Sequence, residues 1–598
     1  MATPTPPSTA PQGWWMYHGD PAHSGCVPAG ASTIDSGNVA TLKHLHDLEL
    51  GGPVLGAPAL VDGFVYAGTA NSKLAQGGNG GAFYKVDVAA GTVAARFCWD
   101  IPLDERDSHG FTGMGCTPAV TGGFVYFSAF NGKVYCLSAS DLSVAWITDL
   151  RYADPVHNQP VSNVAGNDQE PVAAGWASPL VVNGRVYVGM GEGENPELFG
   201  FIYCLDAATG DVDWIFCTNQ FVAGTDNTPN QLPASAVPNP PAPGSRFTLV
   251  QGEPVSRGCS IWSSIAYDQA LGRVYATIGN PMPEPLFNAA GQPLDALPRD
   301  GYGYGILSLD ATSGEFRGFW QIPLESSYRV SDIDIDFAGS PMLFDHPSGK
   351  RAVAAGNKNG GLFVLDADTL QPFSNAGQNP AVSWRQLLPF DSVTGAQIPT
   401  VDAHDGSGQL NPQVTNEASN ALQQENFYGT YSTPAWHPSG ALYIGMGGSN
   451  DNLVAPGIDY QTTPFMRAVS ASTLADLWAT EPAQVQNVGG TNTVARYVAQ
   501  VNGKPGPGSY MYQNPSECAL SLPVVVNDVV LCATTAVSLY AFKADDGTAL
   551  WMDQLGQQTL GLNGGYGFCF GPAVWGTYVV AGALVNGRDG GLLRIYSL

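Results

Sequence analysis

The chain has 598 residues, and its 24 Lys and Arg residues against 51 Asp and Glu residues give a formal net charge of −27. A nucleic-acid binder needs a basic face to neutralise phosphates, so this balance excludes that class of partner. Hydrophobic residues make up 44 % of the chain, enough for a packed core, yet no stretch approaches the roughly 18 uninterrupted apolar residues of a membrane helix. We therefore expect a soluble protein without a membrane span.

Residues 1–12 begin Met1-Ala-Thr-Pro-Thr-Pro-Pro and contain neither a charged n-region nor an apolar h-region. We expect them to form a flexible segment ahead of one domain that covers residues 13–598. A Thr- and Pro-rich start is typical of a chain from which a signal peptide has been removed. The expected location is therefore periplasmic or secreted.

One pattern recurs along the chain: an apolar strand, a turn with Asp or another polar residue that ends near Gly, and a second strand that often closes on Trp. Abundant Gly and Pro, with short Val-, Tyr- and Phe-rich runs of period two, favour strands and tight turns over helices. Seven copies lie at or within 82–91, 133–142, 201–210, 305–314, 361–368, 467–470 and 539–547. We expect their Asp, Gly and Trp residues to form turns and to pack neighbouring sheets.

The two ends of the chain complete an eighth copy. Residues 592–598 begin another repeat that stops short, and residues 41–50 supply the missing outer strand. Small sheets that stack radially bury the faces that each sheet exposes alone. The sequence therefore predicts an all-β, eight-bladed propeller closed by pairing of its N- and C-terminal strands.

Long irregular insertions interrupt this repeat and are rich in proline. They lie near 218–256, 281–300, 371–426 and 481–516. Long loops in a compact domain are usually lids, binding loops or disordered segments. We expect these insertions to cap one end of the propeller.

Four segments carry residues suited to chemistry. They are the acidic run Val186–Glu194, the pair Gly258–Asp268 and Arg273–Pro281, the alternating carboxylates in Ser331–Pro341, and the Gly- and Asn-rich Ala355–Asp366. Together with Gly13–Asp20 they resemble the pyrroloquinoline quinone (PQQ)-dependent alcohol dehydrogenases. The polyvinyl alcohol dehydrogenase branch of that family matches the Gly258–Ser264 segment and the Asp run.

The resemblance implies a calcium ion and a bound quinone. Glu194 takes the position of the calcium-binding glutamate, although Glu192 and Glu197 are rivals because a small shift in register selects either one. Trp262 takes the position of the tryptophan beneath the quinone ring, where an aromatic face suits a planar cofactor. Asn280, 18 positions later, takes that of a calcium ligand.

Asp336 takes the position of the catalytic base, which also lies at the metal. Three alternating carboxylates on one strand-like run repel one another, so a cation must meet them. An EF-hand fits poorly, because Phe337 and Leu343 occupy the positions where such a loop has Gly and Glu. Lanthanide-dependent relatives carry an extra aspartate where this chain has Ala338, which favours calcium.

Lys358 takes the position of the cation that reaches the quinone carbonyl. The resemblance then implies oxidation of a primary or secondary alcohol, small, polyol or polymeric, to an aldehyde or ketone. Asp336 accepts the hydroxyl proton, while Lys358 and the metal ion stabilise negative charge. No CxxCH motif for covalent haem is present, so electrons pass to a separate acceptor such as a cytochrome c.

Four positions depart from the family pattern. Gly110 and Phe111 stand where many relatives have adjacent cysteines, Cys116 lies near the position of the arginine that binds a cofactor carboxylate, and Trp176 replaces a hydroxyl-bearing residue. We expect stacking by Trp176 or Phe111, and a charge from Arg257, to replace the lost contacts.

These departures leave two other functions open. One is a non-catalytic propeller similar to outer-membrane assembly scaffolds. The other is a carbohydrate- or polymer-binding protein that has lost PQQ.

Overall fold

The structure is a computed structural model. It describes residues 11–72, 80–100, 112–150, 175–191, 200–218, 257–282, 302–321, 337–357, 361–373, 384–386, 432–445, 466–480, 521–533, 538–554, 571–585 and 590–598. In these ranges the only helices are two 3-10 turns, η1 (Tyr17–Gly19) and η2 (Val39–Thr41). None of the helices there is long and apolar enough to cross a membrane.

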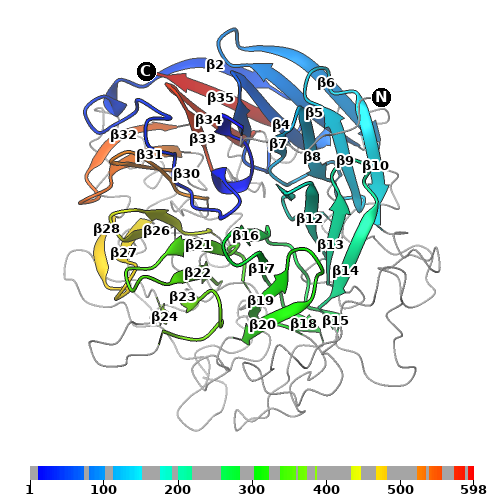
Figure 1. Ribbon diagram of the computed structural model, residues 1–598. Helices are drawn as coiled ribbons and strands as arrows, with labels where there is room; N and C mark the ends of the chain where they lie inside the picture. Colours follow the sequence, from blue (N-terminus) through cyan, green and yellow to red (C-terminus); the bar gives the residue numbers. More distant parts are fainter. Residues whose placement is uncertain are drawn as a thin grey trace, which may run out of the picture.

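Eight antiparallel sheets stand around one axis as the blades of a propeller (Figure 1). The first strands of neighbouring blades contact one another, so they are the innermost strands. Blades 1 to 4 consist of β3 (Ala59–Val61), β4 (Phe64–Ser72), β5 (Gly80–Asp87) and β6 (Thr92–Asp100); β7 (Ala119–Thr121), β8 (Phe124–Ser128), β9 (Lys133–Ser138) and β10 (Val144–Asp149); β11 (Leu180–Val182), β12 (Arg185–Met190), β13 (Phe201–Asp206) and β14 (Val212–Cys217); and β16 (Ala266–Asp268), β17 (Arg273–Thr277), β19 (Gly305–Asp310) and β20 (Phe316–Gln321).

Blades 5 to 8 continue the ring, and the last borrows a strand from the N-terminal part. They consist of β21 (Met342–Asp345), β22 (Arg351–Gly356), β23 (Gly361–Asp366) and β24 (Trp384–Gln386); β25 (Ala435–His437), β26 (Ala441–Gly445), β27 (Met466–Ser470) and β28 (Asp476–Thr480); β29 (Val524–Val526), β30 (Val529–Ala533), β31 (Ser538–Lys543) and β32 (Ala549–Gln554); and β33 (Ala573–Trp575), β34 (Tyr578–Val585), β35 (Gly590–Ser597) and β2 (Lys43–Glu49). The predicted eight-bladed, all-β fold is confirmed.

The predicted closure of the ring is confirmed as well. Strand β2 pairs antiparallel with β35, and the two lie side by side in Figure 1. Across this pair, Arg594 forms two charge-assisted bonds to Asp47, at 2.7 and 2.8 Å. Arg594 also reaches Asp553 of blade 7 at 3.1 Å, which ties the closing strands to the preceding blade.

The repeated Asp, Gly and Trp residues join one blade to the next. In blade 3, Asp206 accepts N–H bonds inside its own turn, and Gly210 closes that turn with a positive φ of 79°. Trp146 of blade 2 packs against Gly210 and donates its indole N–H to Ala207 O at 3.1 Å. These residues therefore serve turn formation and blade packing, as the repeat predicts.

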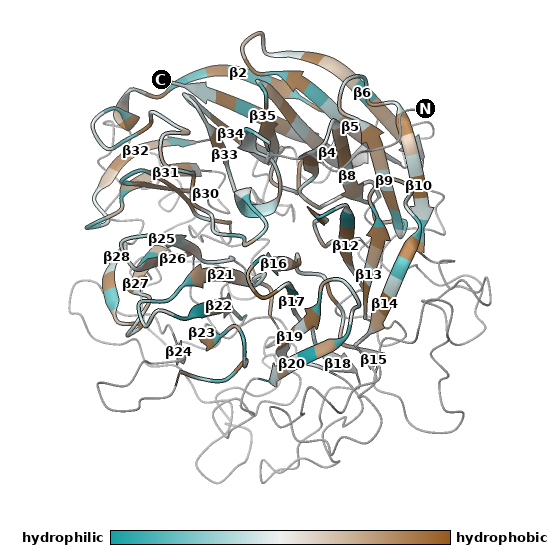
Figure 2. Cartoon of the chain, viewed as in Figure 1, coloured by the Kyte–Doolittle hydropathy of each residue, from teal (hydrophilic) through white to brown (hydrophobic). Residues whose placement is uncertain are grey.

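The hydrophobic core lies between the blades. Inner strands are mostly apolar, whereas the outer strands β2, β6 and β10 alternate polar and apolar residues along the rim (Figure 2). The largest fully buried side chains include Tyr187, Phe83 and Phe127. Stacking of successive sheets thus supplies the burial that a single four-stranded sheet lacks.

An N-terminal segment, residues 14–27, runs along the axis and satisfies the inner edges of the blades. After β1 (Gly13–Trp14) pairs with β3, the middle residues of five inner strands donate their N–H groups to carbonyls of this segment at 2.7 to 2.8 Å. The pairs are Val120 with Trp15, Tyr267 with Pro21, Leu343 with Ala22, Trp436 with Ser24 and Val525 with Gly25. Edge groups that would otherwise face the axis unpaired are thereby bonded.

Antiparallel pairing gives the propeller two distinct ends. Each inner strand begins, and each second strand finishes, at one end, which we call the loop end; Pro118, Pro179 and Asn280 mark it. The opposite end, which we call the turn end, carries short turns such as those at Ala207 and Ala311. The four predicted insertions fall almost wholly outside the described residues, so their capping role stays a prediction.

Candidate functional site

Four of the predicted site residues are described in full, and all belong to the loop end. Cys116, Trp176 and Trp262 each precede an inner strand, those of blades 2, 3 and 4. Asn280 follows the second strand of blade 4. The fold therefore brings residues from distant repeats to one end of three consecutive blades.

The segment with Trp262 crosses from blade 3 to blade 4 and lies against Asn280. Cys259 donates its N–H to Asn280 O at 2.7 Å, and Gly279 donates to Ser260 O at 2.9 Å. Ile261 donates to Met190 O at 3.3 Å. This backbone pairing fixes the separation between Trp262, which is half-buried, and Asn280, which is 1 % exposed.

Two glycines of blade 3 are explained by the close approach of the Trp262 segment. A Cβ added to Gly189 would lie 2.5 Å from Ile261 O, and one added to Gly191 would lie 2.7 Å from Ser260 Cβ. Only residues without a side chain allow the crossing segment to rest on the end of β12. The Gly-rich run that precedes Glu194 thus leaves the space that the Trp262 segment occupies.

Ser260 carries an unused hydroxyl in this segment. Its side chain is 1 % exposed, and Oγ makes no hydrogen bond, although most buried polar groups have a partner. The position is two residues before Trp262 and opposite Gly279. A ligand with polar atoms at this place would satisfy the hydroxyl, and the sequence analysis did not single Ser260 out.

Trp176 is held by blade 2. Its ring stands edge-on to Phe130, with ring centroids 4.6 Å apart, and a Cβ at Gly115 would lie 3.1 Å from the indole. On either side of Trp176 along the chain, the carbonyls of Gly175 and Ala177 lie 3.0 and 2.7 Å from Ser128 Oγ. The half-buried indole is therefore fixed at the loop end.

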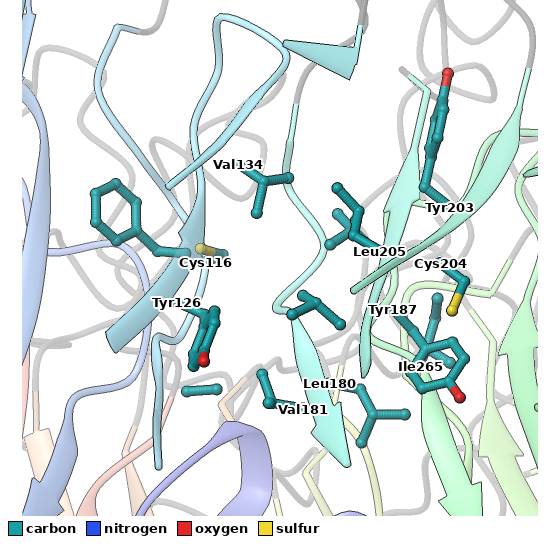
Figure 3. Packing of buried hydrophobic residues seen from close by; sticks show 14 of the residues in the cluster. Cys116, Tyr126, Val134, Leu180, Val181, Tyr187, Tyr203, Cys204, Leu205 and Ile265 are labelled. Carbon is teal, nitrogen blue, oxygen red and sulfur yellow. The ribbon is translucent and has the colours of Figure 1, made fainter. Parts of the chain in front are cut away.

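Cys116 belongs to a hydrophobic cluster that residues of blades 1 to 4 form, part of which is drawn in Figure 3. It is 3 % exposed, and its thiol donates to Ser128 O at 3.3 Å. Burial raises the pKa of Cys116 to about 11, so the thiol is neutral at physiological pH. A buried neutral thiol supplies no positive charge in place of an arginine.

Arg257 is described only through its backbone. It begins the two-stranded sheet of β15 (Arg257–Gly258) and β18 (Pro281–Met282), where Arg257 pairs with Met282. This ladder extends the pairing between the Trp262 segment and Asn280.

The predicted residues Glu194, Asp336 and Lys358 lie outside the described residues, as do Glu192, Glu197 and Phe111. Within the described ranges, no group of three or more His, Cys, Asp or Glu side chains is arranged to hold a metal ion.

A chain of hydroxyl groups runs beneath this site from blade to blade. In blades 2 to 5, the residue two positions before the inner strand donates its backbone N–H to a hydroxyl oxygen of the next blade, at 2.8 to 3.0 Å. That oxygen belongs to the residue at the same position before its own inner strand. The members of this hydroxyl chain are Thr117, Ser178, Ser264, Ser340 and Thr433. Four of these five residues stand directly before Pro, whereas Ser264 stands before Ile265. The repeat pattern alone does not mark them.

Two known families match parts of the chain. Residues 161–383 match the family described as glucose/ethanol/alcohol dehydrogenase, beta-propeller domain. Residues 79–237 match the family of the outer membrane protein assembly factor BamB.

Curated relatives include an alcohol dehydrogenase and a hydroxylase. The chain is 28 % identical over 408 residues to the dehydrogenase subunit of an alcohol dehydrogenase (quinone) from Gluconacetobacter polyoxogenes, a match that covers 65 % of this chain and 49 % of that protein. It is 26 % identical over 384 residues to a lupanine 17-hydroxylase [cytochrome c] from a Pseudomonas species, covering 62 % of this chain and 49 % of that one. The chain therefore spans about half the length of these relatives in each match.

Two solved structures have a similar fold. A europium-containing methanol dehydrogenase superposes with a TM-score of 0.62 at 14 % identity and covers 99 % of both chains. The quinohemoprotein alcohol dehydrogenase of Comamonas testosteroni gives a TM-score of 0.59 at 16 % identity, covering 98 % of this chain and 80 % of that one. These structures confirm the β-propeller fold. The family match over residues 161–383 and the curated relatives show that the chain is similar to quinone-linked alcohol dehydrogenases.

Proposed function

We propose that this protein is a PQQ- and calcium-dependent dehydrogenase that oxidises a primary or secondary alcohol and passes the electrons to a separate acceptor. The observation that carries the proposal is the unpaired Ser260 hydroxyl, buried between Trp262 and Asn280 at the loop end. Similarity to quinone-linked alcohol dehydrogenases supports it.

The described residues fit a planar, polar cofactor. Trp262 offers a half-buried aromatic face, Ser260 a hydroxyl without a partner, and Asn280 a buried amide whose oxygen is a suitable calcium ligand. Trp176 presents a second aromatic ring at the same end of the preceding blade. Stacking on aromatic rings and hydrogen bonds to buried polar groups are what binding such a molecule requires.

The remaining roles are assigned from the family resemblance. Asn280 and Glu194 would hold calcium with Asp336, and Lys358 would stabilise negative charge at the cofactor. Asp336 takes the proton of the substrate hydroxyl as general base. PQQ, when bound, supplies the acceptor for the hydride. Arg257 is proposed to meet a cofactor carboxylate, because Cys116 is neutral.

Substrate and acceptor complete the proposal. We assign the substrate to alcohols, including polymeric ones of the polyvinyl alcohol type, and the location to the periplasm or exterior. A net charge of −27 favours a basic acceptor such as a cytochrome c. Turnover with that acceptor would then fall with added salt, whereas turnover with a neutral dye would not.

A titration tests the cofactor directly. Metal-stripped protein is titrated with PQQ, with and without calcium, and intrinsic tryptophan fluorescence is followed for the wild type, Glu194→Ala and Asp336→Ala. We expect saturable quenching that needs calcium, weakened about tenfold or more by Glu194→Ala. Asp336→Ala should bind PQQ yet fail to oxidise alcohols with an artificial acceptor.

A matched control is Glu315→Ala, which removes an exposed carboxylate from a turn at the turn end. It should bind PQQ as the wild type does. Absence of any saturable quenching in the wild type would contradict the proposal. The match to the BamB family would then favour a non-catalytic scaffold.

A further inference from the structure

Tyr17 lies on the axis, where it meets the hydroxyl chain. Its phenol oxygen is 2.8 Å from Thr433 Oγ1 of blade 6, and Ser340 Oγ of blade 5 lies 3.1 Å away. All three side chains are buried. The 3-10 turn η1 that begins at Tyr17 is part of the N-terminal segment, which five inner strands hold by backbone bonds.

The groups around them favour one direction for each of these bonds. Ser340 Oγ accepts the N–H of Ser264 at 2.8 Å, so its own hydrogen is directed to Tyr17. Tyr17 then donates to Thr433 Oγ1, which also accepts the N–H of Ser340 at 2.8 Å. Burial raises the pKa of Tyr17 more than its hydrogen bonds lower it, so the phenol keeps its proton at neutral pH.

Tyr17 stands where the hydroxyl chain stops. Blades 7, 8 and 1 carry Leu522, Gly571 and Ala57 before their Pro residues, and none of these has a hydroxyl. Tyr17 therefore supplies a hydrogen to the last hydroxyl, Thr433, and an acceptor to the one before it, Ser340.

The same contacts lead to the candidate site. Ser264, bonded to Ser340, is two residues after Trp262. Thr277, three residues before Asn280, lies with its hydroxyl 2.9 Å from Gly339 O and 2.7 Å from Ser263 Oγ. Ser340 and Gly339 thus fix both the strand that follows Trp262 and the strand that leads to Asn280.

We propose that Tyr17 is a positioning residue for the cofactor site, acting through Ser340 and Ser264 on the placement of Trp262. This inference rests on the proposed PQQ binding at Trp262 and Asn280. Loss of the phenol hydroxyl leaves Ser340 without its acceptor and Thr433 without its donor, and the turn that carries Ser264 and Trp262 is free to shift. The N-terminal segment then contributes to cofactor binding without contacting the cofactor.

Tyr17→Phe in the full-length protein tests this role, because it removes one oxygen and keeps the ring. We expect the dissociation constant for PQQ, measured by tryptophan quenching with calcium, to rise about tenfold. Tyr187→Phe is the matched control: this tyrosine is also buried, and its hydroxyl also joins two blades, with a bond of 2.8 Å to Ala311 O, but at the turn end. The control should lower the melting temperature of the apoprotein as much as Tyr17→Phe does and leave PQQ binding unchanged.

Ser340→Ala provides a second variant if Tyr17→Phe does not fold. It should weaken PQQ binding to a similar extent, and the double variant should lose less than the sum of the two effects, because both residues act in one network. Equal PQQ affinities for the wild type and Tyr17→Phe would overturn the positioning role and leave the proposed function intact. A wild type that fails to bind PQQ would instead overturn the proposed function, and this inference with it.

Discussion

The indole N–H of Trp478 donates to Ala544 O of the next blade at 2.8 Å, and Tyr443 donates to the same oxygen at 3.1 Å. The same three-part contact links Trp146 and Tyr126 to Ala207. A tryptophan on an outer strand and a tyrosine on a second strand thus share one turn carbonyl of the following blade. This contact is the physical reason for the Trp and the Asp-Gly turn in the repeat.

Substitutions at Trp478 should separate the hydrogen bond from the packing. We expect Trp478→Phe to lower the free energy of unfolding by about 1 kcal/mol, since Tyr443 still occupies the carbonyl. Trp478→Ala should cost about 3 to 5 kcal/mol, because a large buried ring is lost against Gly547. Urea denaturation measures both, and Leu477→Ala, at a side chain 54 % exposed, is the control with little effect. Equal losses for all three would contradict this account.

The ion pair between Asp47 and Arg594, which joins the two chain ends, predicts that the stability of the fold depends on pH. Burial alone would raise the pKa of Asp47, but the hydrogen bonds and charge of Arg594 lower it overall. Because the pKa of Asp47 is lower in the folded state, its ionised form stabilises the fold at pH values above the unfolded-state pKa. That stabilisation is lost as the pH falls through the folded-state pKa. Asp47 is partly exposed, so we expect Asp47→Asn to cost only about 1 kcal/mol at pH 7.

Urea denaturation at pH 7 and in acid checks this prediction. The difference between the wild type and Asp47→Asn should shrink as Asp47 becomes protonated. An unchanged difference in strong acid would show that the loss comes from packing of the amide and not from the ion pair with Arg594.

The blades could be predicted from the sequence because the repeat is local. A strand, a turn at Asp206–Gly210 and a closing Trp214 lie within a few residues, and each copy repeats that pattern. The pairing of the two chain ends was predicted between residues 41–50 and 592–598, and the structure has it between β2 and β35. It followed from counting strands, because one blade of the ring is divided between the two ends.

The network at the axis could not be predicted in the same way. Tyr17 and Thr433 are 416 positions apart, and no periodicity relates them. Ser260 is one serine among several, and only burial without a partner distinguishes it. The family resemblance marked Trp262 and Asn280, but the glycines that seat them became explicable only through distances.

Gly189→Ala tests whether the placement of the Trp262 segment matters for PQQ binding. A methyl group there would lie 2.3 Å from Ile261 Cγ2 and 2.5 Å from its carbonyl oxygen, so the segment must shift. We expect Gly189→Ala to cost about 1 to 3 kcal/mol of stability and to weaken PQQ binding. Gly318→Ala is the control, because a methyl group there meets only Leu370 at 3.4 Å. Unaltered PQQ affinity in Gly189→Ala, measured by fluorescence, would show that the position of the segment does not matter for binding.

Cys116→Arg tests whether an arginine at this position, as the family resemblance implies for relatives, would strengthen PQQ binding. The side chain lies in the hydrophobic cluster shared by blades 1 to 4, 3 % exposed and bonded to Ser128 O. A guanidinium at this place would give up its hydration inside a packed core, which costs several kcal/mol. We therefore expect Cys116→Arg to lower the free energy of unfolding sharply, without tighter PQQ binding. Cys116→Ser, which keeps a donor of similar size, should lose much less stability and bind PQQ as the wild type does. A stable Cys116→Arg protein with tighter binding would mean that this position opens onto the cofactor, contrary to the packing around the thiol.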